Sequence, residues 1–192
     1  MNDFHKECKC ALTGVGKSTL IQKVCEVLQT SDCPAVGFYT QEVRQAGRRT
    51  GFDVVTLAGS RGPLARVSGI SAGHGDCRVG QYIVDVNSFE QLVIPILTNV
   101  SSNDTYVVDE IGKMELFSQA FRSAVGQLLD RPGTTVLGTL PAPRSRSPEF
   151  VEKVRNRQDV KVFTITKENR NSILNDVIDA VRACRQRTAK DI

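Results

Sequence analysis

The chain has 192 residues, 40% of them apolar and 24% charged, which excludes a disordered polymer and predicts a single domain over residues 1–192. No apolar run is long enough to cross a bilayer, and residues 1–10 are too polar for a signal peptide, so we expect a cytoplasmic protein without membrane contact. The formal charge of +4 is dispersed among acidic residues, which argues against nucleic acid as a partner and favours a monomer that binds an anionic small molecule.

Short apolar runs alternate with amphipathic helical stretches along the chain, the pattern expected when helices cover both faces of a mostly parallel sheet. The expected strands, in chain order, are 9–13, 35–44, 51–57, 81–86, 105–109, 134–139 and 160–165. The expected helices are 17–29, 88–98, 117–129 and 172–187, the second of them capped by Asn87 or Ser88. The fold class is therefore predicted to be α/β.

Two features interrupt the simple alternation of strand and helix. The second and third expected strands are joined by residues 45–50, which predicts a β-hairpin inserted after the first helix. The Gly- and Ser-rich span 60–76 that follows the hairpin is expected to be a loop.

The segment Thr-Gly-Val-Gly-Lys-Ser-Thr lies between the first expected strand and helix. A loop that wraps phosphate needs glycine, because its backbone N–H groups turn inward in conformations that a Cβ obstructs, and Gly14 and Gly16 meet that need. The helix that begins at Lys17 directs its free N–H groups at the anion, the Lys17 ammonium reaches the β- and γ-phosphates, and the Ser18 hydroxyl binds Mg²⁺. The expected nucleotide-binding residues here are Thr13, Gly14, Val15, Gly16, Lys17, Ser18 and Thr19.

A second chemical signal is the apolar run Tyr-Val-Val that ends in two adjacent carboxylates, Asp109 and Glu110. Successive side chains of a strand point to opposite sides, so the two carboxylates can take different roles. We expect Asp109 to hold Mg²⁺, directly or through water, and Glu110 to orient and polarise the attacking water. The alternative is that the acidic pair caps a helix.

Three longer stretches, 37–44, 51–57 and 108–116, read Gly-Phe-Tyr-Thr-Gln-Glu-Val-Arg, Gly-Phe-Asp-Val-Val-Thr-Leu and Val-Asp-Glu-Ile-Gly-Lys-Met-Glu-Leu. With them, the chain from Leu12 to Arg182 resembles the THEP-type nucleoside triphosphatases. The resemblance implies a P-loop, RecA-like fold that hydrolyses the terminal phosphate of ATP, GTP and other nucleoside triphosphates with Mg²⁺ and low base specificity. It assigns the Walker A roles to Lys17 and Ser18, and the Walker B roles to Asp109 and Glu110.

The phosphate loop departs from the family pattern Leu-Thr-Gly-Pro-Pro-Gly-Val-Gly-Lys-[Ser/Thr], because three residues are missing after Gly14. Two registers are compatible with the sequence. In one, the first strand stops early and residues 11–16 form the loop, with Ala11 in the place of the first glycine. In the other, the strand keeps residues 10–13, and the loop is too short to encircle the β-phosphate.

Basic and amide side chains complete the expected site. Arg44 and Lys113, which lie inside the family-like stretches, are the first candidates to stabilise charge on the transferring phosphoryl group, with Arg48 and Arg49 as further choices. The alternative for each is a surface ion pair. Asn169 and Arg170 follow the last expected strand, where such folds place the loop that contacts the base.

Three functions remain open from the sequence. The first is an Mg²⁺-dependent nucleoside triphosphatase, and the second is a nucleotide-binding or regulatory module whose shortened loop no longer supports turnover. The third is a kinase that acts on a small acceptor, which the absence of an arginine-rich lid in the sequence disfavours.

Overall fold

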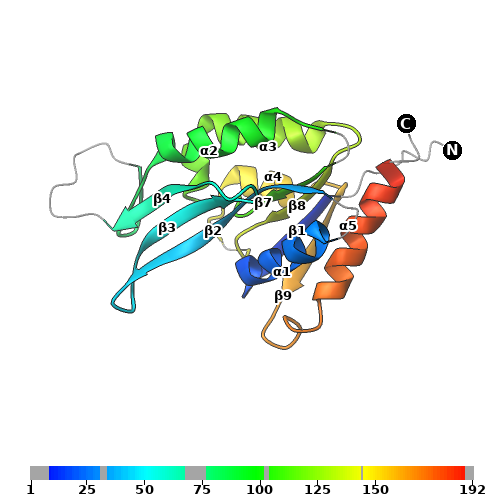
Figure 1. Ribbon diagram of the computed structural model, residues 1–192, viewed down its shortest axis with the longest axis horizontal. Coiled ribbons are helices and arrows are strands. Elements are labelled where there is room, and N and C mark those ends of the chain that lie inside the picture. Colours follow the sequence, from blue (N-terminus) through cyan, green and yellow to red (C-terminus); the bar gives the residue numbers. More distant parts are fainter. Residues whose placement is uncertain (1–8, 31–33, 68–76, 102–103, 144, 189–192) are drawn as a thin grey trace.

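The computed structural model describes residues 9–30, 34–67, 77–101, 104–143 and 145–188, and its centre is a nine-stranded sheet (Figure 1). The order of the strands across the sheet is β5-β6-β4-β3-β2-β7-β8-β1-β9. Their bounds are β1 Lys9–Gly14, β2 Ala35–Gln45, β3 Arg48–Thr56, β4 Arg61–Val67, β5 Arg78–Val79, β6 Tyr82–Val84, β7 Thr105–Val108, β8 Thr135–Thr139 and β9 Val160–Ile165. The neighbours β2, β7, β8, β1 and β9 are parallel, and the strands beyond β2 extend the sheet in antiparallel pairs.

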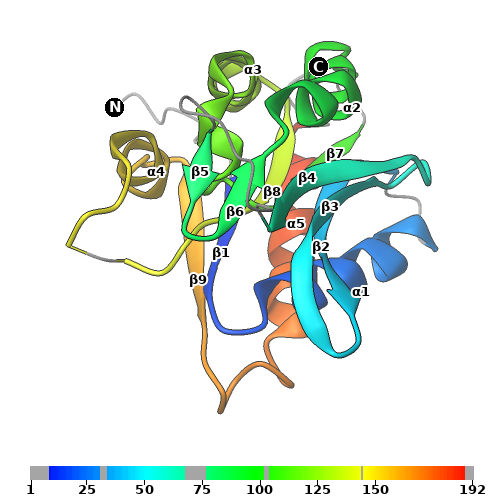
Figure 2. The ribbon, with the colours of Figure 1, turned by 90° about the vertical axis from the view of Figure 1, so that its left-hand side faces the viewer.

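Helices cover both faces of the parallel strands, as an α/β fold requires (Figures 1 and 2). The helices are α1 Lys17–Gln29, α2 Val86–Thr98, α3 Gln119–Asp130, α4 Glu149–Arg155 and α5 Leu174–Thr188, with a short 3-10 helix at Glu115–Phe117. Buried residues of α2, α3 and α4 form one core cluster, and those of α1 and α5 form a second cluster on the other face. The predicted three-layer α/β class is therefore confirmed. Among the described residues, no helix has the length and apolarity needed to span a bilayer.

The inserted hairpin is confirmed, although its turn is tighter than predicted. Strands β2 and β3 pair antiparallel as far as Gln45 and Arg48, so the turn is Ala46-Gly47 rather than residues 45–50. Both turn residues have positive φ, 46° and 78°, as in the two-residue turns whose twist matches that of the flanking strands.

The loop predicted for residues 60–76 is wrong over Arg61–Val67, which forms β4 and pairs with β3. The strand forms because Leu64 and Ala65 bury their side chains in the core with α2. Residues 68–76 of that predicted loop lie outside the described residues.

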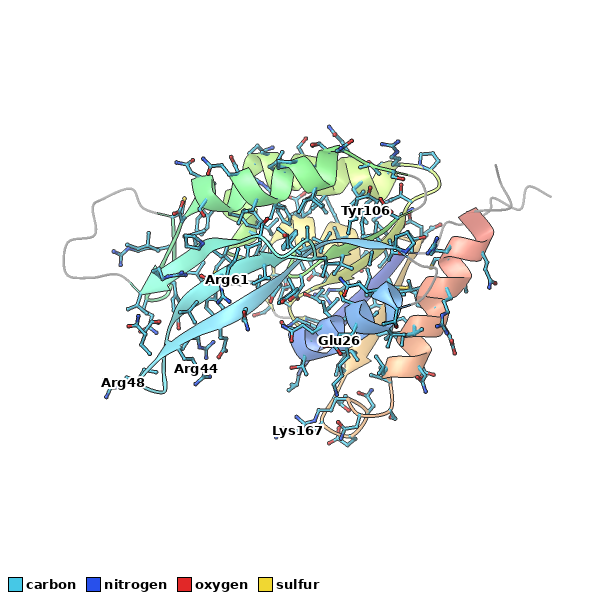
Figure 3. All side chains as sticks on the ribbon, in the orientation of Figure 1. Glu26, Arg44, Arg48, Arg61, Tyr106 and Lys167 are labelled. Atoms are coloured by element: carbon cyan, nitrogen blue, oxygen red, sulfur yellow. The ribbon has the colours of Figure 1, made fainter. Side chains whose placement is uncertain are left out.

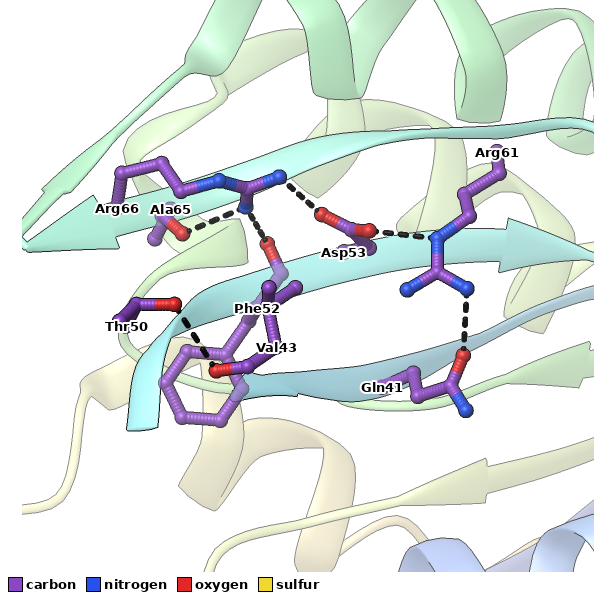
Figure 4. Close-up of polar contacts among 8 residues, drawn as sticks. All are labelled: Gln41, Val43, Thr50, Phe52, Asp53, Arg61, Ala65 and Arg66. Carbon is purple, nitrogen blue, oxygen red and sulfur yellow. Dashed lines mark hydrogen bonds and ion pairs between the residues drawn. The ribbon is translucent and has the colours of Figure 1, made fainter. Parts of the chain in front are cut away.

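Polar contacts fasten this antiparallel extension together (Figure 4). Asp53 in β3 accepts from Arg61 Nε at 2.6 Å and also pairs with the Arg66 guanidinium, both from β4. Arg61 reaches on to Gln41 Oε1 in β2 at 2.9 Å, and Arg66 donates to the carbonyl of Phe52 at 2.7 Å. These contacts connect the side chains of β2, β3 and β4.

Several predicted element ends need correction. Helix α2 begins at Val86, and its cap is Asp85, which accepts from Ser88 N at 2.9 Å, rather than Asn87 or Ser88. Helix α3 begins after Ser118, whose hydroxyl accepts from Phe121 N at 2.8 Å. The strand predicted at 81–86 is shortened to β6, because the acidic cap opens the next helix, and α4 and β5 were not predicted.

Candidate functional site

The candidate site lies at the edge of the sheet formed by the carboxyl ends of the parallel strands. Strand β1 runs between β8 and β9, and β7 runs between β2 and β8, all in the same direction. In open α/β sheets the carboxyl ends of the strands meet at one edge, which is where such folds bind ligands. The phosphate loop after β1 and the carboxylates after β7 therefore share an edge.

The structure adopts the register in which the first strand keeps its full length. Strand β1 pairs with β9 through Gly14, which lies opposite Ile165, so that Val15 and Gly16 alone connect the strand to α1. Ala11 lies inside the strand with 3% of its surface exposed and does not enter the loop. Gly14 has φ 106°, and a Cβ there would collide with the carbonyl oxygen of Ile165, so both strain and space require glycine.

In the short turn, one of the backbone N–H groups that could bind phosphate is already hydrogen-bonded within the protein. Val15 N donates to Ile165 O at 3.1 Å, which ties the turn to β9. The first intrahelical bond of α1 runs from Leu20 N to Gly16 O at 3.0 Å, so the N–H groups of Lys17, Ser18 and Thr19 have no partner within the helix. Those three N–H groups, at the positive end of α1, are the part of the loop that can bind an anion.

The side chains of the loop differ in where they point. Lys17 is half-buried and its ammonium donates to the Gly14 carbonyl at 3.5 Å, folding back over the turn. Thr13 is buried and donates to Pro141 O at 3.2 Å. The side chains of Val15 and Thr19 are exposed, Val15 to 52%, so that Thr19 offers its backbone N–H alone and the Val15 N–H is taken by Ile165.

Asp109 is fully buried and held by hydroxyl groups from three separate elements. Its Oδ1 accepts from Thr139 Oγ1 at 2.6 Å, and its Oδ2 accepts from Thr40 N at 3.3 Å and Thr40 Oγ1 at 3.4 Å. The Ser18 hydroxyl lies close enough to this carboxylate to lower its pKa. Burial raises the pKa of Asp109, and the hydrogen bonds from Thr139, Thr40 and Ser18 and the charge of Lys17 oppose that rise.

The predicted metal-binding pair, Ser18 and Asp109, is therefore brought together. Their hydroxyl and carboxylate oxygens are the hard donors that Mg²⁺ prefers, and Mg²⁺ usually keeps several waters and takes one or two protein carboxylates. The donor set fits magnesium. Among the described residues, no group of three or more His, Cys, Asp and Glu side chains suits a metal bound wholly by protein.

Glu110 and Glu115 form a second pair of carboxyl groups at the same edge. Burial raises the pKa of Glu110, an effect that Lys17 opposes and Asp109 reinforces. Glu115 is 4% exposed, accepts from Gly112 N at 3.2 Å, and has its pKa raised to about 8 by burial and by the charge of Glu110. Both carboxyl groups lie against Gly112, where a Cβ would stand 2.9 Å from Glu110 Oε1 and 3.1 Å from Glu115 Oε2.

A cavity of about 340 Å³ joins the loop to these carboxyl groups. Its wall includes Gly14, Lys17, Glu110 and Lys113, so the structure brings together four of the residues predicted from the sequence. Thr40, Glu115 and Arg146 also contribute to the wall.

Arg44, Asn169 and Arg170 are absent from the wall of this cavity. Arg44 lies near the turn of the hairpin (Figure 3), where it pairs with Glu42 Oε2 at 2.7 Å. The Asn169 side chain accepts from Thr166 N at 2.8 Å and donates to Thr164 O at 2.9 Å, within its own turn after β9, and Arg170 is exposed. Their roles in charge stabilisation and base contact remain predictions.

Sequence reasoning missed the residues that hold or accompany the predicted ones. Thr40, Thr139 and Arg146 meet the site only through the order of the strands and the path of the loop after β8. Glu115 carried a usable signal, because it is a charged residue inside the stretch 108–116 that resembles the family.

Comparison with known proteins gives consistent results. The family model NTPase_1, described as NTPase, matches residues 10–178. The human cancer-related nucleoside-triphosphatase is 56% identical over 180 residues, which cover 90% of this chain and 94% of the human protein. The solution structure of a human cancer-related nucleoside triphosphatase superposes with a TM-score of 0.81 at 55% identity, over 92% of this chain and 98% of that one. The crystal structure of THEP1 from Aquifex aeolicus superposes with a TM-score of 0.78 at 34% identity, over 90% of this chain and 98% of that one.

Proposed function

The chain belongs to the NTPase_1 family, and we propose that it is an Mg²⁺-dependent hydrolase that converts nucleoside 5'-triphosphates to the diphosphate and phosphate. ATP, GTP and other nucleoside triphosphates are the proposed substrates, with low base specificity, and the human and bacterial relatives are named nucleoside-triphosphatases. The observation that carries the proposal is the approach of the Ser18 hydroxyl to buried Asp109, which Thr139 and Thr40 hold in place, beside a cavity that Lys17 and Glu110 share.

Each residue then has a role that follows from its position. The free N–H groups at the start of α1 bind phosphate oxygens, and Lys17 exchanges its long contact with the Gly14 carbonyl for the β- and γ-phosphates. Ser18 and Asp109 would hold the magnesium ion, which neutralises charge on the phosphates when it is bound. Thr139 and Thr40 fix the Asp109 carboxylate from β8 and β2.

Glu110 is the proposed group that orients the attacking water and accepts its proton. A carboxyl group whose pKa is raised toward neutrality is a stronger base, and burial raises the pKa of Glu110 in this way. Lys113, which lines the same cavity, is the proposed cation that stabilises charge on the transferring phosphoryl group. The base contact proposed for Asn169 and Arg170 adds little specificity, since the Asn169 amide is engaged within its own turn.

A second candidate function, a nucleotide-binding or regulatory module with impaired turnover, is favoured by the length of the turn. Strand β1 continues to Gly14, and the Val15 N–H bonds to β9 instead of facing an anion. Each charge-assisted hydrogen bond contributes roughly 1.5–3 kcal/mol, so the loss of two weakens nucleotide binding by about a hundredfold or more.

The two candidates are separated by measuring phosphate release from ATP and from GTP with Mg²⁺. The test compares the parent chain, its Glu110→Gln variant, and a variant with Pro-Pro-Gly inserted after Gly14. Activity of the parent that is lost in Glu110→Gln establishes the hydrolase and shows that the two-residue turn supports turnover. If the parent releases no phosphate and the insertion variant does, the chain is the impaired form. If neither releases phosphate, the catalytic assignment is refuted.

A further inference from the structure

The cavity at the edge of the sheet has two chemically different halves. Gly14, Lys17 and Glu110 form the half that belongs to the phosphate site. The other half is walled by apolar side chains from β3, β4, β5 and the segments next to the 3-10 helix and α4, namely Phe52, Leu64, Val79, Met114 and Pro148. None of these apolar side chains has a part in the proposed hydrolytic mechanism.

The side chains that form the apolar half are packed against neighbouring residues. The Phe52 ring packs against Tyr82 with centroids 5.2 Å apart in an edge-to-face arrangement, and the Arg49 guanidinium lies 5.4 Å from the ring centroid. Leu64 is 1% exposed and belongs to the core beneath. The Asp53 contacts in Figure 4 hold β3 and β4 together behind this wall.

A bound polyphosphate would gain nothing from an apolar wall, since phosphate oxygens need hydrogen-bond donors and cations. The sheet order also separates the two halves from the region after β9. Strand β9 lies on one side of β1, whereas β3, β4 and β5 lie on the other, beyond β8, β7 and β2. A nucleotide with its base near β9 and its phosphates at α1 would leave the apolar half free.

The charges around the cavity favour an anionic partner. Lys17, Lys113 and Arg146 line the cavity, and within the described part of the chain no ion pair is recorded for these three cations. Glu115 in the same wall is protonated at neutral pH, because burial holds its pKa at about 8. Cations therefore outnumber ionised carboxylates, and a flat apolar body with one negative group matches both the wall and its charge.

We propose that the apolar half of this cavity, beside Glu110, binds a second small molecule, an organic anion with a flat apolar ring body, separately from the nucleotide. The whole cavity, at about 340 Å³, is in the range of small-molecule sites, and the proposed molecule takes the apolar part of it. This proposal does not depend on hydrolysis, and binding is measured without nucleotide or metal.

The test uses the full chain and a fluorescent probe of this chemistry, 1-anilinonaphthalene-8-sulfonate. Val79→Trp places bulk in the apolar half, and Val67→Trp is its control, because Val67 ends β4 with 39% exposure and does not line the cavity. We expect saturable binding that Val79→Trp weakens at least about tenfold and Val67→Trp leaves unchanged. Lys113→Met is expected to weaken it about threefold or more, whereas Lys23→Met on the exposed side of α1 serves as the control.

Circular dichroism and urea unfolding establish that each variant is folded, and Val79→Phe replaces Val79→Trp if the larger side chain prevents folding. Equal affinities of the two valine variants would overturn the proposal, since the probe then binds elsewhere. Displacement of the probe by ATP or adenosine would also overturn it, because the apolar half would then be the base pocket of the nucleotide site.

Discussion

Replacing Glu115 by glutamine is expected to make the free energy of unfolding less dependent on pH. The Glu115 carboxyl group is 4% exposed and has a pKa of about 8 in the folded protein, against 4.5 for an ordinary glutamate. The folded state therefore keeps a proton that the unfolded chain loses above pH 4.5. The contribution of Glu115 to the free energy of unfolding therefore falls as pH rises from 4.5 toward 8 and no longer changes above pH 8.

The size of the effect follows from the two pKa values. At about 1.4 kcal/mol per unit of pKa, ionisation of the unfolded chain costs the protein about 2 kcal/mol at pH 6 and nearly 5 kcal/mol at pH 9. A glutamine has no such dependence, and its carbonyl can still accept from Gly112 N, the present donor at 3.2 Å. The difference in unfolding free energy between variant and parent should therefore grow by roughly 3 kcal/mol between pH 6 and pH 9.

Urea unfolding followed by circular dichroism at pH 6, 7, 8 and 9 measures this difference. Glu149→Gln is the matched control, because Glu149 is an exposed glutamate on α4 with a lowered pKa and stays ionised throughout that range. Titrating groups that do not interact with Glu115 contribute equally to parent and variant, so they cancel in the difference. Parallel curves for the parent and Glu115→Gln would refute the assignment of a protonated carboxyl group to this wall of the site.

Three further changes test separate parts of the structure. Gly14→Ala should lower the free energy of unfolding by about 1–3 kcal/mol, because φ at Gly14 is 106° and the added Cβ meets Ile165 of the neighbouring strand β9. Gly126→Ala in α3 should raise the free energy of unfolding by up to about 1 kcal/mol. Urea unfolding that changes both variants in the same direction would contradict this reasoning. Asp53→Asn should speed hydrogen exchange of β3 and β4 amides, with a stability loss of roughly 1 kcal/mol because its two arginine partners are half-exposed; unchanged exchange would show that the ion pairs do not hold the extension. Ser18→Ala and Asp109→Asn should each reduce any Mg²⁺-dependent phosphate release by about a hundredfold or more, and full activity of either variant would remove that residue from the metal site.

The elements with regular periodicity could be predicted from the sequence. Helix α1 was predicted with its observed bounds, because Leu20, Ile21, Val24, Val27 and Leu28 recur on one face. All of them are buried except Val27, which is partly buried. Strand β4 was missed because its polar and proline residues resemble a loop, whereas its pairing with β3 and β6 and the burial of Leu64 and Ala65 depend on tertiary structure. The short α4 offers too few turns for a period to show.

The site was predictable where its residues lie next to each other in sequence and not where strand order assembles them. The proximity of Ser18 to Asp109 was expected from two local motifs. Thr40 and Thr139 are distant from both motifs and reach Asp109 only because β2 and β8 flank β7 on either side. No local pattern encodes that adjacency.

The phosphate-binding part and the carboxylate part of the candidate site depend on different portions of the chain, so the shortened loop affects them differently. Asp109 is held by Thr139 from β8 and by Thr40 from β2, and neither contact involves the turn between β1 and α1. The loss of loop residues therefore acts on the phosphate contacts of the backbone and leaves the carboxylate end of the site assembled. Because α1 still begins at Lys17, with Ser18 near Asp109, the residues that would bind metal and activate water stay in place, and we expect the short turn to change nucleotide affinity above all.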